Sequence, residues 1–113
     1  DKEFGCTATA WDARGEVDAD IVINATPLGM KGEFESNSPY EASWFKSGML
    51  AYDLVYNPLQ TLFLRQAQAA GCIVVDGLAM FLGQAAEQFR LWTDREMDQE
   101  FGREICIQAL QAS

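Results

Sequence analysis

The chain has 113 residues, of which 49% are hydrophobic and 22% charged, which is enough for one domain with a buried core and too few for two ordinary domains. Its 17 acidic and 8 basic residues give a net charge of -9, which argues against nucleic acid and anionic membranes as partners because both would be repelled. The absence of histidine excludes imidazole zinc sites, Ser-His-Asp triads and any histidine general base.

The three cysteines, Cys6, Cys72 and Cys106, lie far apart and form no CxxC pair, so we expect neither a disulfide framework nor a structural zinc site. The acidic residues form no evident metal site. Reduced thiols in an acidic chain are typical of a cytoplasmic protein. No apolar run approaches the ~20 residues that span a bilayer, and we expect no signal peptide at the start of the chain. The first residue is Asp1 rather than methionine, so we expect a piece of a longer protein.

Four short segments have the composition of β-strands. Residues 6–10 place β-branched side chains in an alternating setting, as a half-buried strand does. Residues 21–25, 49–55 and 72–76 are nearly continuously apolar, which is typical of strands that are buried on both faces. Such strands belong to parallel sheets, so the sequence predicts a mostly parallel sheet that is covered by helices on both sides.

Helical stretches alternate with these strands. Ser38 and Glu41 form a capping box with Pro39 at the first helical position, which predicts a short helix through Phe45. A second helix is expected over residues 61–70. We expect it to end directly before Gly71, which can adopt the left-handed conformation that terminates helices.

A pair of helices is predicted at the C-terminal end, over residues 78–92 and 94–112. The first has apolar residues at helical spacing, and we expect this stripe to be core. The second begins at a capping box formed by Thr93 and Glu96 and repeats apolar residues every four positions. Together with the strands, these helices predict an α/β fold with right-handed crossovers. The expected core stripe consists of Leu78, Leu82, Ala85, Phe89 and Trp92.

In a parallel sheet of this kind, ligands bind beyond the carboxyl ends of the strands. Three segments of the chain lie there, namely residues 24–30, 53–57 and 76–80. The polar and glycine residues of the chain concentrate in these segments. The fold therefore predicts where a ligand binds without identifying the ligand.

Individual residues in these segments have both a functional and a structural interpretation. Thr26 can meet a phosphate, a ribose or a ring amide, or it can cap its own turn. Asp53, inside a buried strand, needs hydrogen-bond donors, and we favour a role in fixing the neighbouring loop. Tyr56 can donate to a substrate or pack with its hydroxyl in water. Gln84 shares a helix face with Met80 and suits a hydroxylated ligand, although an exposed glutamine alone implies nothing.

Three blocks of the chain resemble the shikimate dehydrogenase family. They are residues 20–30 (DIVINATPLGM), residues 52–61 (YDLVYNPLQT) and residues 71–92. Family members have similar blocks in this order and at similar spacing, and the resemblance covers residues 3–94. Because three ordered motifs are far more specific than one, the sequence is identified as a member of this family.

The resemblance implies an oxidoreductase of aromatic amino-acid biosynthesis, the chorismate pathway, that reduces 3-dehydroshikimate to shikimate with NADPH; NAD is the other possible cofactor. It implies an incomplete Rossmann-like three-layer fold. In such a site Met80 packs on the nicotinamide, and the backbone of Leu54 and Gly77 lies near it. The implied cofactor-binding residues are Asn24, Ala25, Thr26, Leu54, Gly77 and Met80, and the implied substrate-binding residues are Tyr56 and Gln84.

The chain also lacks parts of the family pattern. It has no glycine-rich phosphate loop, no counterpart of the arginine loop that recognises the 2′-phosphate of NADP, and none of the substrate domain with its catalytic lysine and aspartate. We therefore expect residues 1–113 to be a single partial domain, the C-terminal portion of a shikimate dehydrogenase cofactor-binding domain, with no catalytic residue and no activity of its own. Ala79 and Gly83 also depart from the family pattern; Ala79 stands where the family usually has glycine.

In a Rossmann-like sheet of order 3-2-1-4-5-6, the four predicted strands would be strands 3, 4, 5 and 6. The strand at residues 21–25 would then be an exposed apolar edge, and such edges pair with other chains. We expect self-association through this edge, or packing of residues 6–10 onto it.

Two alternatives stay open. A quinate/shikimate dehydrogenase would use NAD or NADP, whereas a non-catalytic module of the same fold would bind a small molecule as a sensor. The arginine loop and the catalytic lysine would separate these alternatives, and neither is part of this sequence.

Overall fold

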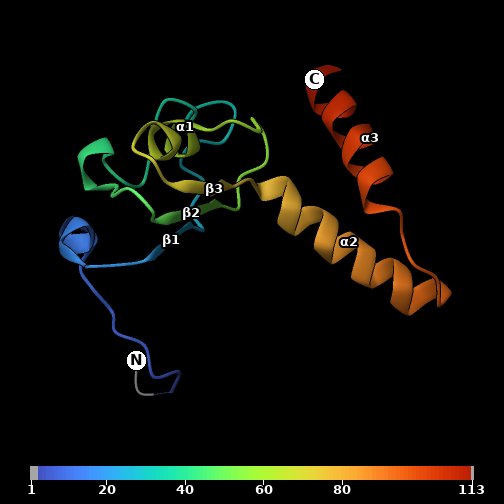
Figure 1. Ribbon diagram of the computed structural model, residues 1–113, viewed down its shortest axis with the longest axis horizontal. Helices are drawn as coiled ribbons and strands as arrows, with labels where there is room; N and C mark the ends of the chain where they lie inside the picture. Colours follow the sequence, from blue (N-terminus) through green and yellow to red (C-terminus); the bar gives the residue numbers. More distant parts are fainter. Residues whose placement is uncertain (1–2, 113) are drawn as a thin grey trace.

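The computed structural model describes residues 3–112, which form one three-stranded sheet, two short 3-10 helices and three α-helices (Figure 1). None of the helices in this range combines the length and the apolar content needed to cross a membrane. In chain order the elements are η1 (Trp11–Glu16), β1 (Ile21–Asn24), η2 (Ala42–Trp44), β2 (Leu50–Asp53), α1 (Leu62–Ala69), β3 (Ile73–Val75), α2 (Gly77–Thr93) and α3 (Gln99–Ala112).

The sheet is parallel, and its strands lie side by side in the order β1-β2-β3. Ile21 aligns with Leu50, and Leu50 aligns with Ile73. The three apolar strands predicted from the sequence are therefore confirmed, although each is shorter than expected. Because all three run in the same direction, the loops that follow them meet at one edge of the sheet.

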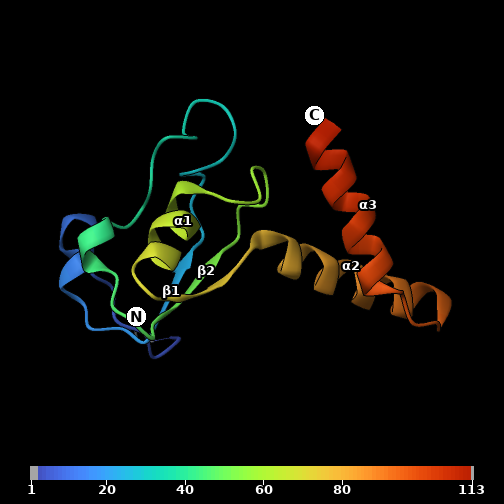
Figure 2. The same cartoon turned by 45° about the horizontal axis from the view of Figure 1, so that its top comes forward.

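α1 covers one face of the sheet and forms the core with it (Figure 2). Phe63, Leu64 and Ala67 of α1 are at most 1% exposed and belong to the same buried cluster as Ala51 of β2. Burying a leucine or phenylalanine side chain stabilises a fold by about 1.5–3 kcal/mol. Gly71 follows α1 with a φ of 89°, which confirms the predicted left-handed end of this helix.

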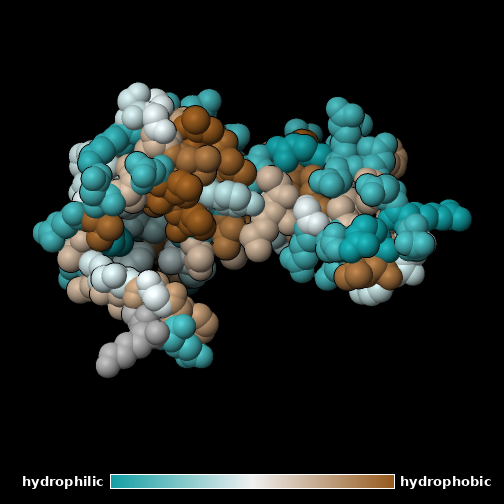
Figure 3. Space-filling view, turned by 60° about the horizontal axis from the view of Figure 1, so that its bottom comes forward, coloured by the Kyte–Doolittle hydropathy of each residue, from teal (hydrophilic) through white to brown (hydrophobic). Residues whose placement is uncertain are grey.

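The opposite face of the sheet carries no helix within residues 3–112. Ile21 and Ile23 of β1 are each 58% exposed, and Ile73 of β3 is 62% exposed. Figure 3 shows a contiguous hydrophobic area on this lobe of the molecule. The predicted α/β fold with a parallel sheet is confirmed. The expected second helical layer is missing from the described residues, because the helices that follow β3 run away from the sheet.

α2 and α3 form a hairpin that projects from the sheet (Figures 1 and 2). Arg103 of α3 forms a salt bridge of 2.6 Å with Asp76, the residue before α2. The radius of gyration is 16.0 Å, against about 13 Å for a compact chain of ~100 residues. Leu78 and Leu82 are buried, but Trp92 is 79% exposed. The prediction that the whole stripe is core is therefore wrong, since no strand among residues 3–112 lies beneath the outer half of α2.

Residues 6–10 form no strand, contrary to the prediction. They are exposed, irregular backbone that leads into η1. The preference of threonine for strands depends on a neighbouring strand to pack against. Within the described residues β1 pairs with β2 alone, so no second strand holds this segment in an extended conformation.

The capping box predicted at Ser38 is wrong. The Ser38 hydroxyl donates to the Tyr40 carbonyl at 2.9 Å and accepts the Tyr40 N–H at 3.3 Å. The side chain thus closes a turn over two residues instead of capping a helix over three. The helical turn starts later and is limited to η2, after Glu41.

The capping box predicted at Thr93 is also wrong, because this residue ends α2 instead of starting the next helix. Its hydroxyl donates to the Phe89 carbonyl at 2.7 Å. Asp94 follows with a φ of 54°, the left-handed conformation that terminates many helices. α3 begins further along the chain, where the Asp98 carboxylate accepts the Phe101 N–H at 3.0 Å.

Candidate functional site

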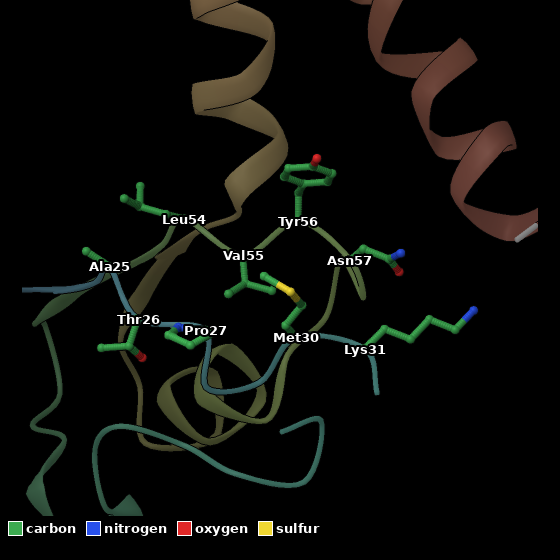
Figure 4. A pocket seen from close by; sticks show the side chains of 9 residues that line it. All are labelled: Ala25, Thr26, Pro27, Met30, Lys31, Leu54, Val55, Tyr56 and Asn57. Atoms are coloured by element: carbon green, nitrogen blue, oxygen red, sulfur yellow. The ribbon is translucent and has the colours of Figure 1, made fainter. Parts of the chain in front are cut away.

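Two neighbouring cavities open at the carboxyl edge of the sheet. The larger, of about 490 Å³, lies between the loops that follow β1 and β2 (Figure 4). The smaller, of about 160 Å³, lies between the loop after β2 and the first turns of α2. The larger cavity is lined by Ala25, Thr26, Pro27, Met30, Lys31, Leu54, Val55, Tyr56 and Asn57, and the smaller by Leu54, Tyr56, Gly77, Met80, Phe81 and Gln84.

Most residues predicted to form a site lie together here. Leu54 and Tyr56 line both cavities. Ala25 and Thr26 join them in the larger cavity, and Gly77, Met80 and Gln84 join them in the smaller. Asn24 is the exception, because it lies behind the loop after β1 and is 2% exposed.

The side chain of Asn24 has a partner for each of its hydrogen-bonding groups. Its Nδ2 donates to the Leu28 carbonyl at 3.0 Å and to Asp53 Oδ1 at 3.1 Å. Its Oδ1 accepts the Thr26 N–H at 3.0 Å and the Thr26 hydroxyl at 2.6 Å. Asn24 therefore holds the loop after β1 from the inside.

Asp53 is fully buried at the end of β2. Its Oδ1 also accepts the Val55 N–H at 2.9 Å, and its Oδ2 accepts the Thr61 hydroxyl at 2.6 Å. Burial raises the pKa of the Asp53 carboxyl above its ordinary value, because desolvation outweighs the hydrogen bonds from Thr61, Val55 and Asn24 that lower it. The interpretation that Asp53 fixes its neighbouring loop is confirmed.

Thr61 completes this network and was not singled out from the sequence. It is fully buried, and its hydroxyl accepts the Leu64 N–H at 3.2 Å while donating to Asp53. A threonine directly before the first turn of a predicted helix is a typical N-cap. The place of Thr61 in the sequence therefore indicates that its hydroxyl is engaged at the start of α1. Through Thr61, Asp53 and Asn24, the two loops of the larger cavity are joined to the start of α1.

Gly77 places the first turn of α2 directly against the loop after β2. A β-carbon on Gly77 would lie 2.5 Å from the Val55 carbonyl oxygen and 2.6 Å from that of Leu54. Only glycine permits so close an approach of two backbone segments. The side chain of Asp76 caps the same turn by accepting the Ala79 N–H at 3.1 Å.

Tyr56 and Gln84 contribute the polar side chains of the smaller cavity. The Tyr56 ring centroid lies 5.2 Å from that of Phe81 on α2, and the Tyr56 side chain points away from the loop after β1 (Figure 4). The phenol and the amide can both donate a hydrogen bond to a hydroxylated ligand. Met80, 47% exposed, adds an apolar surface beside them.

The electrostatics of the cavities differ from those of the whole chain. Lys31 is the only charged residue among those that line them, whereas the net charge of the chain is -9. The lining residues therefore add no negative charge that would repel an anionic ligand. Within residues 3–112, no three Cys, Asp or Glu side chains come together as metal ligands.

Known proteins are similar to this chain in sequence and in fold. The family model described as the shikimate 5'-dehydrogenase C-terminal domain matches residues 77–111. A shikimate dehydrogenase (NADP(+)) of Oleidesulfovibrio alaskensis is 49% identical over 111 residues, which cover 96% of this chain and 40% of the relative. The chain belongs to the shikimate dehydrogenase family.

Solved structures of the family have the same fold. The shikimate dehydrogenase of Thermus thermophilus, in complex with NADP(H) and shikimate, is 42% identical with a TM-score of 0.75, over 88% of this chain and 36% of that one. A quinate dehydrogenase from Corynebacterium glutamicum in complex with NAD is 35% identical with a TM-score of 0.76, over 87% and 33%. The chain spans 28–40% of the length of these curated relatives.

Proposed function

We propose that this chain forms part of the cofactor and substrate site of an NADP-dependent shikimate dehydrogenase, which reduces 3-dehydroshikimate to shikimate. The observation that supports this most is the meeting of three strand-end segments around two neighbouring cavities. The proposed cofactor-binding residues are Asn24, Ala25, Thr26, Leu54, Gly77 and Met80, and the proposed substrate-binding residues are Tyr56 and Gln84.

The residues of the cavities suit a nicotinamide cofactor. The absence of a side chain at Gly77 keeps the backbone of Leu54 within reach of the cavity beside α2. Met80 offers a polarizable apolar surface for a planar ring. A bound nicotinamide would supply the hydride, and the chain would orient it. Asn24 would act through the loop that it holds, since its side-chain groups are engaged within the chain.

In this proposal Tyr56 and Gln84 hold the substrate. Both side chains border the cavity that Met80 and Gly77 also line, so a substrate there would lie next to the nicotinamide. Each side chain can bond a ring hydroxyl or a carboxylate of shikimate. Proton transfer would depend on residues outside the 113 positions of this chain. We therefore assign no catalytic role to any residue of the chain.

The proposal also concerns the place of this chain in a longer protein and the location of that protein in the cell. We propose that residues 1–113 are the C-terminal portion of a cofactor-binding domain in a cytoplasmic enzyme, and the family model that matches residues 77–111 supports the first part. That the 113 residues have no activity by themselves stays a prediction.

The test is an assay of the full-length protein with shikimate as substrate, followed through the absorbance of the reduced nicotinamide. We expect oxidation of shikimate with NADP⁺ and a large loss of kcat/KM in a Gln84→Ala variant. Binding of the dinucleotide without any oxidation of shikimate would favour a ligand-sensing module instead.

A second candidate is a quinate/shikimate dehydrogenase that uses NAD. The similarity to the Corynebacterium glutamicum quinate dehydrogenase in complex with NAD favours it. Comparing kcat/KM for shikimate with NADP⁺ and for quinate with NAD⁺ decides between the two, because the preferred pair has the higher value.

We further propose that the chain self-associates through β1. The outer edge of this strand has no partner strand within residues 3–112. Ile21 and Ile23, each 58% exposed, lie on the same uncovered face as Ile73. An apolar strand at a sheet edge presents both unpaired backbone groups and hydrophobic side chains to a second copy.

A further inference from the structure

Thr26 lines the larger cavity, and the single proton of its hydroxyl can serve only one acceptor. The acceptor that it serves decides whether Thr26 offers a ligand a donor or an acceptor. A phosphate oxygen needs a donor, whereas a ribose hydroxyl or an amide N–H can use an acceptor. The hydrogen bonds behind the loop determine which of the two Thr26 provides.

The chain of hydrogen bonds starts at Asp53. Its Oδ1 accepts the Val55 N–H at 2.9 Å, and a backbone N–H can only donate, so this oxygen must be an acceptor. The neighbouring group of Asn24, 3.1 Å away, must then be its Nδ2 rather than its Oδ1. The second proton on Nδ2 goes to the Leu28 carbonyl, which also can only accept.

The orientation of Asn24 is passed on to Thr26. With Nδ2 directed at Asp53 and Leu28, the Asn24 Oδ1 faces Thr26 and accepts its hydroxyl proton at 2.6 Å. The Thr26 oxygen in turn accepts the Leu28 N–H at 3.2 Å. The proton of Thr26 is therefore engaged inside the protein, and one lone pair of its oxygen is left for a ligand.

We propose that Asp53, acting through Asn24, sets the hydrogen-bond polarity of Thr26, so that Thr26 accepts a hydrogen bond from the ligand and selects a hydroxyl or amide N–H over a phosphate oxygen. This inference rests on the proposed function, in which the ligand is a nicotinamide dinucleotide. In the nicotinamide half of such a cofactor, two groups supply a donor, namely the carboxamide and the ribose hydroxyls. A phosphate oxygen at Thr26 would place lone pairs against each other. Asp53 and Asn24 are positioning residues here.

The ligand contact is tested by calorimetric titration of the full-length protein and its Thr26→Val variant, which keeps the shape of the side chain and removes the hydroxyl. The probes are NADP⁺, its 3-acetylpyridine analogue, which lacks the carboxamide N–H, and analogues that lack one hydroxyl of the nicotinamide ribose. A fourth probe, 2′,5′-ADP, has phosphates but no nicotinamide half. Thr26→Ser should bind like the wild type, and Thr7→Val on the exposed N-terminal segment serves as the matched control.

We expect Thr26→Val to bind NADP⁺ about fivefold more weakly, the effect of one hydrogen bond, and 2′,5′-ADP as tightly as the wild type does. The fivefold difference should vanish with the analogue that lacks the donor, which identifies the carboxamide or the ribose hydroxyl as its source. An equal loss of affinity for 2′,5′-ADP would overturn the proposal, because this probe lacks the nicotinamide half that supplies the proposed donor. An unchanged affinity for NADP⁺ would overturn it as well.

The part played by Asp53 is tested without any ligand, by NMR. Both side-chain amide protons of Asn24 should exchange slowly with solvent in the wild type. They should remain protected in Asp53→Asn, whose carbonyl can still accept from Val55 and Asn24, and lose protection in Asp53→Leu, which has a similar shape but no acceptor. Equal protection in the wild type and Asp53→Leu, or rapid exchange in the wild type, would refute the role of Asp53.

The two tests also separate this inference from the proposed function. A wild-type protein that binds neither NADP⁺ nor NAD⁺ would contradict the proposed function and the ligand contact together. The NMR result would still decide whether Asp53 orients Asn24. If the Asp53→Leu variant does not fold, the wild type and Asp53→Asn are compared alone. Slow exchange of the Asn24 amide protons in both supports the role of Asp53, and rapid exchange in either refutes it.

Discussion

Gly77 and Val55 approach each other so closely that a β-carbon on Gly77 would lie 2.5 Å from the Val55 carbonyl oxygen. This contact joins the first turn of α2 to the loop after β2. The two cavities meet along the same loop, so their shape depends on this backbone contact.

We expect Gly77→Ala to lower the free energy of unfolding by about 1–3 kcal/mol, as overpacking does, and to weaken cofactor binding by displacing the loop. Chemical denaturation and cofactor titration measure the two effects. Gly83→Ala is the matched control in the same helix, because a β-carbon there has nothing within 4 Å. That variant should gain about 0.5–1 kcal/mol from the helix propensity of alanine. Wild-type stability and affinity in Gly77→Ala would show that the contact does not shape the site.

Gln84→Ala in the full-length protein should raise KM for shikimate and lower kcat, since a ring hydroxyl would lose its partner and the substrate its orientation. Steady-state kinetics at saturating NADP⁺ gives both constants. KM for NADP⁺ serves as an internal control and should change little. Unchanged kinetics with shikimate would remove Gln84 from the site.

Tyr56→Phe should weaken shikimate binding by about 1 kcal/mol, the value of one hydrogen bond. The ring contact with Phe81 at 5.2 Å is retained in this variant, so stability should stay near that of the wild type. Titration with shikimate in the presence of NADP⁺ measures the change. Equal affinity in the two proteins would make Tyr56 a packing residue.

Burial raises the pKa of Asp53 above its ordinary value of 3.8. The folded protein therefore binds this proton more tightly than the unfolded chain does. The resulting contribution to stability is fully present below pH 3.8 and is lost as the pH rises through the raised pKa.

Asp53→Asn should remove this pH dependence, so that its free energy of unfolding falls less with rising pH above 3.8 than that of the wild type. Denaturant titrations of the two proteins over a pH series give the comparison. The other carboxyl groups are common to both and cancel in the difference. Parallel pH profiles would contradict the raised pKa.

Ile23→Lys should shift the 113-residue chain toward the monomer, because a lysine at a sheet edge opposes pairing with another strand. Sedimentation velocity over a range of concentrations measures the change. Ile105→Lys on α3 is the control, because this substitution adds the same charge away from the sheet. The two isoleucines are similarly exposed, Ile105 at 49% and Ile23 at 58%. A wild-type chain that is monomeric at all concentrations would reject self-association through β1.

The predicted elements that the structure confirms are those whose pattern is local. Each of the three strands is a short and nearly uninterrupted run of apolar residues, which is not typical of a helix. α1 has an N-cap at Thr61 and a left-handed glycine, Gly71, after its last turn. Residues 6–10 and the stripe that ends at Trp92 were predicted wrongly for the opposite reason. A strand or a buried stripe also needs a partner surface, and composition does not reveal whether one is present.

The candidate site divides in the same way. Parallel strands bring their following loops to one edge, so the sequence predicted that Thr26, Tyr56 and Gly77 lie near each other. The engagement of the Thr26 proton by Asn24 depends on the 3.1 Å hydrogen bond between Asn24 on β1 and Asp53 on β2, and no spacing in the sequence specifies that distance.

By itself, the sequence determined the α/β class, the parallel strands and the three segments that line the candidate site, because backbone periodicity and turn residues act over a few positions. Only the tertiary structure decided that, within residues 3–112, no helix covers one face of the sheet, that Thr61 completes the network around Asp53 and that Gly77 touches the backbone of Val55. Each of these depends on the packing of segments far apart in the chain, where a displacement of one ångström makes or breaks a contact.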